Sequence, residues 1–337
     1  MNRAVLAGMV VIGVLFPAVR SFCQSEEDLQ GFLAQLEAGR PVIYRNLTVV
    51  PVFARNSQGS GDAGSYLTLD QALEQNVLEI REKDGGDVPW VVVSNRSARR
   101  IFIMGGEILS GCKQDRIVAR DVLIAPRRKG LLLPVYCVES GRWHHVSGEF
   151  RSEKNLGTYS MRAAAQGVSG NNQMEVWNRV AESNRKLGVR SDTEAYQDAF
   201  RNEGVAELVS ELERKLKDLP RLERGTTGVI VALGEQIIGV DIFASPDLFE
   251  ALWPKIIRAC VVAMSGYEKD EKDASFSGVQ AARFLNALQW VRYGRRPGVD
   301  LGFEYAAELK DFTVSALVYN DAVCHVGAVP CDSSTEF

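Results

Sequence analysis

The sequence has few of the residues and motifs on which many catalytic and metal centres depend. It contains only three histidines, His144, His145 and His325, and no two cysteines stand at the two-residue spacing of a zinc knuckle. It has neither a G-x-S-x-G nucleophile elbow nor a G-x-x-x-x-G-K-[ST] phosphate-binding loop. A histidine-rich metal centre, a structural zinc site and a serine hydrolase triad are therefore unsupported, and we expect no metal and no cofactor.

The sequence also lacks a block of basic residues. The 337 residues carry a formal net charge of −4, with 39 Lys and Arg against 43 Asp and Glu. Binding to nucleic acid depends on neutralising phosphates with clustered cations, so nucleic acid is not an expected partner. Hydrophobic residues make up 46% and charged residues 24% of the chain, which is typical of a folded globular protein rather than a disordered one.

Long hydrophobic runs are absent except at the N-terminus. Arg3 precedes an apolar stretch, residues 4–19, which is broken by Pro17 and closed by small or polar residues. This pattern predicts a signal peptide over residues 1–23, cleaved before Gln24, and hence a secreted or periplasmic protein. The alternative is an uncleaved N-terminal helix that anchors the chain to a membrane. No later segment approaches the roughly 20 apolar residues that span a bilayer, so we expect no transmembrane span in the mature chain.

Export would place the cysteines in an oxidising compartment, where disulfides form. Five cysteines would remain after cleavage, so at least one would stay unpaired. Cys324 and Cys331 could close a small loop, and Cys112 and Cys137 could meet in the fold. The sequence leaves the pairing open.

The order of strand-like and helix-like segments predicts an α+β fold. Residues 89–139 contain short runs rich in β-branched residues, which indicate a mostly antiparallel sheet or sandwich in the N-terminal half. Helices and β-hairpins follow in the C-terminal half. We expect a single domain over residues 24–337, with a surface loop and a candidate internal boundary at the Gly-, Ser-, Ala- and Asn-rich residues 152–172.

Local signals predict individual elements within this fold. Gly234-Glu235 suits a two-residue turn in a hairpin over residues 227–243, and Asn320-Asp321 suits another turn. Ser245 and Pro246 form the N-cap and first position of a helix. Apolar residues at helical spacing predict further helices over residues 25–39, 68–82, 171–188, 195–219 and 281–293.

The stretch "GGEILSGCKQDR", residues 105–116, concentrates polar residues after a predicted strand. Its two glycines permit a tight or left-handed turn, and Glu107 comes directly after that turn. If residues 111–118 are extended, Lys113 and Asp115 share one face while Gln114 and Arg116 share the other. Two of these four side chains would then point toward a site and two toward solvent or a structural salt bridge.

A second polar cluster, "PVYCVESGRWHH" at residues 134–145, ends another predicted strand. Alternation places Cys137 and Glu139 on one face of that strand, with the carboxylate at the rim of a buried surface. Arg142 lies beyond the following turn and could pair with Glu139. Farther along, Asp241 is expected on the more exposed face of its strand.

Four blocks in this order, "GGEILSGCKQDR", "LPVYCVESGRW", "QMEVW" and "GVIVALGEQIIGVDIFASPDLFEALWPKIIRA", give the chain a family resemblance. Over about residues 40–330 it resembles the ADP-ribosylglycohydrolase and rhodanese-phosphatase superfamily-associated protein domain. That family has no settled activity, so the resemblance implies signature positions without roles: Glu107, Lys113, Gln114, Arg116, Cys137, Glu139, Arg142 and Trp143.

Two functional hypotheses follow. The first is a pocket for a small anionic ligand, which carries a phosphate or nucleotide group by association with the family. Glu107 and Glu139 would be its candidate acid or base, and its ligand-binding residues would be Lys113, Gln114, Arg116, Arg142 and Trp143. The second is a non-catalytic structural or interaction module in which the same charges form a buried ion-pair network. Whether the protein is an enzyme and how it oligomerises stay open.

Overall fold

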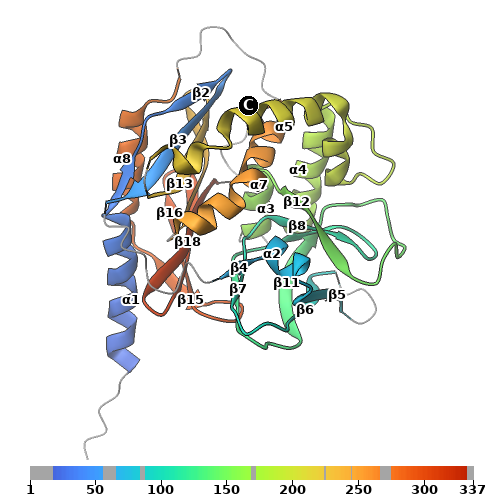
Figure 1. Cartoon of the computed structure of the whole chain (residues 1–337), viewed down its shortest axis with the longest axis horizontal. Helices are drawn as coiled ribbons and strands as arrows, with labels where there is room; N and C mark the ends of the chain where they lie inside the picture. Colours follow the sequence, from blue (N-terminus) through green and yellow to red (C-terminus); the bar gives the residue numbers. More distant parts are fainter. Residues whose placement is uncertain are drawn as a thin grey trace, which may run out of the picture.

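The computed structural model describes residues 18–55, 66–83, 88–167, 172–223, 225–243, 245–265 and 275–331, with side chains from residue 26 onward. Three β-sheets and the helices between them form an α+β fold in this part of the chain, which confirms the predicted class (Figure 1). Residues 1–17 of the predicted signal peptide lie outside the described residues, as do residues 168–171 of the expected loop.

The largest sheet has nine antiparallel strands, which come from both the N-terminal and the C-terminal parts of the chain. Strand β3, from the N-terminal part of the chain, pairs with β13, from its C-terminal half, so that Val50 lies opposite Ile230. In spatial order the strands are β1 (Leu36–Ala38), β3 (Leu47–Ala54), β13 (Thr226–Leu233), β14 (Gln236–Phe243), β18 (Ala322–Pro330), β17 (Phe312–Tyr319), β16 (Phe303–Leu309) and β15 (Gly294–Pro297), and β2 (Val42–Tyr44) pairs with β3.

Alternating residues of this sheet are buried on its two faces, as the two-residue period of a strand requires. Val50 and Val52 face a core with α1 (Ala18–Leu33) and α8 (Gly278–Leu288). Val49 and Val229 face the opposite way, toward α5 (Glu203–Leu216) and α7 (Pro246–Ser265). Figure 1 shows α1 and α8 on one side of the sheet and α7 on the other, between the large sheet and the two smaller ones.

The N-terminal half of the fold contains the two smaller sheets. A six-stranded antiparallel sheet has the order β12 (Phe150–Leu156), β8 (Glu107–Gly111), β9 (Arg116–Val118), β11 (Leu131–Cys137), β6 (Trp90–Asn95) and β5 (Leu78–Glu82). A three-stranded sheet contains β10 (Val122–Ile124), β7 (Ile101–Ile103) and β4 (Leu67–Thr68). A shared apolar core packs these sheets against α2 (Leu69–Glu74).

The remaining helices pack on the six-stranded sheet, on the nine-stranded sheet and on neighbouring helices. They are α3 (Tyr159–Gln166), α4 (Asn172–Lys186), the 3-10 helix η2 (Tyr196–Arg201) and α6 (Leu219–Leu222). The indole of Trp253 on α7 donates a 2.7 Å hydrogen bond to the carbonyl of Leu216 at the end of α5. None of the helices in the described ranges combines the length and apolarity needed to cross a bilayer.

Several local predictions are confirmed. β13 and β14 form the predicted hairpin, and Gly234 in its turn has φ 57°. Asn320 and Asp321 turn the chain between β17 and β18 with φ 48° and 60°. The Ser245 hydroxyl accepts a hydrogen bond from the Leu248 amide at the start of α7. In each case the turn or cap residue meets a backbone requirement that is local in the chain.

The helix predicted over residues 68–82 is too long. It ends as α2 at Glu74, because Asn76 turns the chain with φ 55°, and residues 78–82 form β5. Leu78 and Ile80 alternate with more exposed neighbours, and Ile80 pairs with Val93 of β6. The apolar spacing of this segment fits a helix and a strand, and pairing with β6 decided between them.

The prediction of a surface loop over residues 152–172 is also wrong. This range contains the end of β12 and the whole of α3, whose N-cap is Thr158. The small residues that suggested a loop, Ala163, Ala164 and Ala165, are buried, and they allow α3 to pack closely against its neighbours. An internal domain boundary in this range stays a prediction.

Three other helices differ in extent from their prediction. The helix expected over residues 25–39 ends at Leu33 and is followed by β1. The helix expected over residues 195–219 is divided at Asn202, which caps α5, and its first part is η2. The helix expected over residues 281–293 ends at Leu288.

Candidate functional site

An open polar cleft of about 690 Å³ lies at the edge of the six-stranded sheet. Its floor is formed by the end of β8, by Asp115 in the bend before β9, and by Glu139 and Arg142 after β11. β12, residues 193–201 and Arg258 of α7 complete its walls. The two polar clusters of the sequence thus meet at one cavity.

Arg142 holds the two clusters together. Its guanidinium donates to both carboxylate oxygens of Glu139, at 2.8 and 2.5 Å, and to Oδ1 of Asp115 at 3.2 Å. It also donates to the carbonyl of Cys112 at 2.7 Å. The predicted ion pair between Glu139 and Arg142 therefore forms, and Asp115 joins it. These three side chains are nearly buried, so their geometry is fixed before any ligand arrives.

Two of the carboxylates that line the cleft, Asp115 and Glu139, have different proton affinities. Burial raises the pKa of Asp115 to about 6, although the Gly111 amide and Arg142 favour its charged form. For Glu139, burial acts in the same direction, but hydrogen bonds from Arg142 and from the Asp115 amide lower its pKa overall. One carboxylate thus stays ionised at neutral pH while the other exchanges a proton near it, which is the arrangement that general acid–base chemistry uses.

A chain of hydrogen bonds extends from Asp115 along the cleft wall. Ser110 Oγ donates to Asp115 Oδ2 at 3.3 Å and accepts from Gln197 Nε2 at 2.8 Å. Gln197 Oε1 in turn accepts from Asn155 Nδ2 at 2.6 Å. These uncharged groups position Asp115 without neutralising it.

Residues 111–118 are not extended throughout, so the condition for alternation of their side chains is not met. The chain bends at residues 112–114, and β9 begins only at Arg116. Gln114, Asp115 and Arg116 are all buried, and only Lys113 keeps partial exposure. The bend allows consecutive side chains to point into the protein, which a regular strand does not.

Arg116 and Gln114 lie behind the cleft rather than in it. Gln114 Nε2 donates to the carbonyl of Glu139 at 2.8 Å. Arg116 donates to Gln114 Oε1 at 3.3 Å and to Cys137 Sγ at 2.9 Å. Burial raises the pKa of the Cys137 thiol to about 11, so this thiol is protonated at neutral pH. The three side chains support the backbone that carries Asp115 and Glu139.

Trp143 and Lys113 lie on the surface beside the cleft and do not line it. Lys113 Nζ stands 5.6 Å from the centre of the Trp143 ring, which is 57% exposed. Of the five residues expected to bind ligand, Arg142 alone lines the cavity. Ligand binding by all five stays a prediction.

Glu107 does not belong to the cleft. It is fully buried on β8, where it pairs with Lys255 of α7 and accepts a 3.1 Å hydrogen bond from the Met104 amide. Lys255 also pairs with Asp70 at 2.9 Å. Burial raises the pKa of Glu107 to about 7, against the effect of Lys255. The turn before it forms as predicted, with Gly106 at φ 102°.

A second buried polar cluster, around Asp241, was not predicted. Asp241, expected on an exposed face, has no exposed surface and is held by Arg162 of α3 through two hydrogen bonds of 3.0 and 2.6 Å. Tyr159 donates to the same carboxylate at 2.8 Å. His325 lies between Asp121, at 2.7 Å, and Asp241, at 3.1 Å.

Asp241 on β14 is buried because α3 packs over this strand. A lone cation in an apolar segment is the signal that could have indicated such clusters: Arg162 lies in "YSMRAAAQ" and Lys255 in "LWPKII". Buried cations are rare unless paired, so each implies a carboxylate partner. Nothing in the sequence says which one.

The five cysteines with described side chains are all free thiols. The disulfide considered between Cys324 and Cys331 does not form, because Cys324 is buried toward Tyr66 while Cys331 lies beside Thr313. Cys112 and Cys137 are not bonded either. Across the described ranges, no group of three or more His, Cys, Asp or Glu side chains is arranged to hold a metal ion.

Fold and site together define an α+β protein of three sheets with a charged cleft at the edge of one sheet. The profile of the ARG and Rhodanese-Phosphatase-superfamily-associated Protein domain matches residues 35–329, and the chain belongs to this family. The resemblance inferred from the sequence blocks is thereby confirmed. No match was found among curated proteins or among solved structures. The family name describes associations of the domain and states no reaction.

Proposed function

We propose that the protein binds a small polar ligand with an anionic group in the cleft of Asp115, Glu139 and Arg142. The observation that carries the proposal is the open space of about 690 Å³ above charged groups that are already fixed by hydrogen bonds. Preorganised polar groups at a cavity are what small-ligand sites share.

The charges of the cleft suit a phosphate ester of a sugar or nucleoside. Arg151, Arg201 and Arg258 line the walls. Arg201 pairs with Asp198 at 2.5 Å and Arg258 with Glu213 at 3.0 Å, so a bound phosphate would share their guanidinium donors with these carboxylates. Asp115 and Glu139 on the floor accept hydrogen bonds from hydroxyl groups. In such a complex Asp115 would hold or transfer a proton, and Glu139 would stay ionised and keep Arg142 in place.

Calorimetric titration with sugar phosphates, nucleotides and ADP-ribose tests this function. We expect one of these compounds to bind, and the double variant R151Q/R201Q to weaken binding by at least tenfold, because each lost charged hydrogen bond is worth about 1.5–3 kcal/mol. R221Q is the matched control, since Arg221 on α6 is also an exposed, ion-paired arginine and does not line the cleft. Absence of binding by every compound would contradict the proposal.

The role of Asp115 is tested by D115N, which retains the size and the hydrogen-bonding oxygen of the side chain. If the bound ligand is converted, D115N loses turnover and keeps binding, whereas an unchanged rate would remove Asp115 from the chemistry.

The structural alternative has its own supporting observation. Gln114, Arg116, Glu139 and Arg142 are each at most 8% exposed, and they bond to one another or to the neighbouring backbone. If the network is purely structural, E139Q should lower the unfolding temperature, and no ligand should change the unfolding temperature of the wild type. A ligand-dependent rise in the unfolding temperature that R151Q/R201Q abolishes would decide for the binding site.

Export stays a proposal that rests on the sequence pattern of residues 1–23. Intact-mass measurement of the protein recovered from its native host tests it, because cleavage before Gln24 removes a defined mass. Recovery of the full-length chain in the membrane fraction would instead support the N-terminal anchor.

A further inference from the structure

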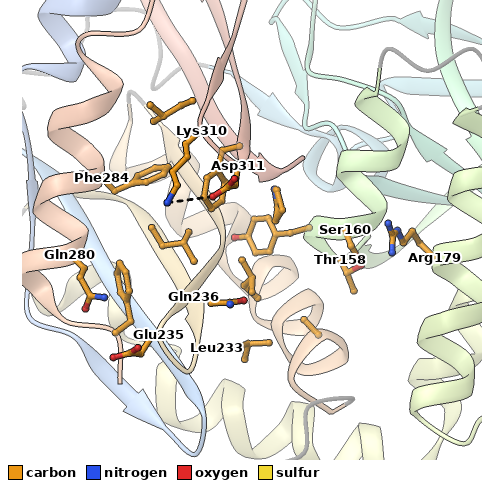
Figure 2. A pocket seen from close by; sticks show the side chains of 18 of the residues that line it. Thr158, Ser160, Arg179, Leu233, Glu235, Gln236, Gln280, Phe284, Lys310 and Asp311 are labelled. Atoms are coloured by element: carbon orange, nitrogen blue, oxygen red, sulfur yellow. Dashed lines mark hydrogen bonds and ion pairs between the residues drawn. The ribbon is translucent and has the colours of Figure 1, made fainter. Parts of the chain in front are cut away.

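A second cavity, of about 830 Å³, lies apart from the polar cleft, and within the described part of the chain the two share no lining residue (Figure 2). It is enclosed by the β13–β14 hairpin, the start of α3, the second half of α4, the end of α7, one face of α8 and the β16–β17 turn. Its volume falls within the range of about 300–1,000 Å³ that is typical of small-molecule sites.

Apolar side chains that are only partly buried gather at this cavity. They come from the hairpin, from α8 and from the β16–β17 turn, so no single element accounts for them. Partly exposed apolar groups that converge on a hollow favour an apolar ligand body over water. These groups belong to Ile237, Ile238, Phe284, Ala287, Leu309 and Phe312.

The rings of Phe284 and Phe312 form a corner of the cavity wall, which we call the ring corner. Their centroids are 5.2 Å apart and their planes are inclined at 75°, which is an edge-to-face pair. A third ring can stack on one member of such a pair and meet the other edge to face. An alkyl chain makes neither contact, so the ring corner favours an aromatic ligand.

The wall formed by Tyr159 is rigid. The Tyr159 hydroxyl donates a 2.8 Å hydrogen bond to Asp241, and the guanidinium carbon of Arg162 lies 5.0 Å from the centre of the ring. The backbone of Gly239 contacts the ring so closely that a methyl group there would overlap it. The ring is therefore held in place before any ligand enters.

Gln280 supplies a fixed polar group at the start of α8. Its Oε1 accepts hydrogen bonds from the Ser277 amide at 2.9 Å and from the Ser277 hydroxyl at 2.7 Å, as part of the capping box of the helix. Its Nε2 has no hydrogen bond to a described residue, so it can donate to a hydroxyl or carbonyl oxygen of a ligand. Figure 2 shows Gln280 and Phe284 on the same side of α8, one helical turn apart.

The charged groups on the lining have both signs. Lys310 pairs with Asp311 at 3.6 Å (Figure 2), and Glu182 pairs with Lys186 at 2.7 Å. A ligand with a net charge would meet groups of its own sign as well as of the opposite one, whereas a neutral ligand leaves these pairs intact. The other charged lining residues are Arg179, Glu235 and Arg283.

We propose that this cavity binds a neutral aromatic compound of two or more rings that carries a hydroxyl or carbonyl oxygen. One ring lies in the ring corner of Phe284 and Phe312, and the oxygen accepts a hydrogen bond from Gln280. The apolar surface, the ring corner and the mixed charges together favour this class over an alkyl chain or an ion. The site is independent of the polar cleft, and neither proposal requires the other.

Titration of the full chain with para-phenylphenol at pH 7 tests the proposal, with cyclohexylcyclohexanol as its saturated counterpart and biphenyl carboxylate as a charged one. We expect saturable one-to-one binding of para-phenylphenol. The saturated alcohol should bind about tenfold more weakly, because it lacks the ring contacts, and the carboxylate should bind no more tightly than the phenol. Equal binding of the phenol and the saturated alcohol, tighter binding of the carboxylate, or no binding of the phenol would each overturn the proposal.

A pair of leucine variants makes the test specific to the ring corner. F284L should weaken binding of para-phenylphenol by about tenfold and leave the saturated alcohol unaffected, because an apolar side chain remains and only the ring is removed. F303L is the matched control, since Phe303 is also an accessible phenylalanine and does not line the cavity, and it should change neither. An equal effect of the two variants on the phenol would contradict the placement of its ring.

The hydrogen bond from Gln280 is tested by Q280E. Glutamate retains the acceptor oxygen that the capping box uses, but it lacks the amide donors. We expect Q280E to weaken binding of para-phenylphenol by about fivefold and to leave binding of biphenyl unchanged. An equal loss for both compounds would contradict the proposed contact with the oxygen.

A last variant addresses occupancy of the cavity. A287W should fill it from α8 and abolish binding of the phenol and of the saturated alcohol, while its circular dichroism spectrum shows that the fold is retained. Retained binding in A287W would place the ligand elsewhere. A concentration-dependent dimer that excludes para-phenylphenol would assign the cavity to a second copy of the chain and would overturn the proposal.

Discussion

The buried imidazole of His325 should make the stability of the protein fall as the pH rises from 6 to 10. His325 is 1% exposed and lies between Asp121 and Asp241, with Arg162 on the far side of Asp241. Burial acts to lower the pKa of the imidazole, but the two carboxylates outweigh it and raise the pKa from 6.5 to about 9. The charged form is thus favoured in the folded state.

The size of the effect follows from this pKa difference. Each pKa unit corresponds to about 1.4 kcal/mol, so the charged imidazolium contributes about 3 kcal/mol to the free energy of unfolding. Because the folded pKa is the higher one, this contribution is fully present below pH 6.5. It falls as the pH rises toward 9 and is absent above that.

Urea unfolding of the wild type and of H325Q, measured at intervals between pH 6 and pH 10, checks this. Glutamine keeps hydrogen-bonding groups at the position but cannot become charged. The difference in unfolding free energy between the two proteins should shrink by about 3 kcal/mol across the range. Lysines, tyrosines and free thiols titrate in both proteins, so they cancel in the difference. A difference that stays constant with pH would refute the reasoning.

Three further predictions concern the buried groups. K255M should lower the free energy of unfolding by about 3–5 kcal/mol at pH 8 in a urea titration, since Glu107 would be left without its cation. The loss should be smaller at pH 5, where Glu107 is protonated. An equal loss at the two pH values would contradict this. G239A should destabilise the protein by about 1–3 kcal/mol in thermal unfolding, because a methyl group there would overlap the Tyr159 ring; an unchanged unfolding temperature would show that the ring can move. Among the cysteines with described side chains, the half-buried Cys331 should react first with a thiol reagent under native conditions and the four buried ones only after unfolding, and rapid reaction of more than one would contradict the fold.

The short-range features of this protein could be predicted from sequence because their causes are local. Gly234 is a residue that adopts positive φ at little cost, and Ser245 followed by Pro246 caps and starts a helix wherever the chain leads. The alternating runs of the N-terminal half predicted strands for the same reason. These signals depend on neighbours within a few residues and do not depend on the rest of the fold.

Predictions failed where an element depended on a distant partner. Residues 78–82 became a strand because β6 offered an edge to pair with, and α3 formed from a segment of small residues because it packs between two sheets. Neither partner is visible in the local pattern. The same holds for the candidate site, where the sequence identified Glu139 and Arg142 and their pairing but placed Glu107 with them.

The sequence by itself determined the α+β class, the family, the hairpin turns and the two polar segments that meet at the cleft. The tertiary structure alone decided which charges share a cavity. The bend at residues 112–114 places Asp115 beside Glu139, whereas Glu107 pairs with Lys255 of α7 outside the cleft. The physical reason is that turns and caps satisfy backbone groups within a few residues. Burial, pairing of charges and the pKa values that follow from them depend on segments far apart in the chain.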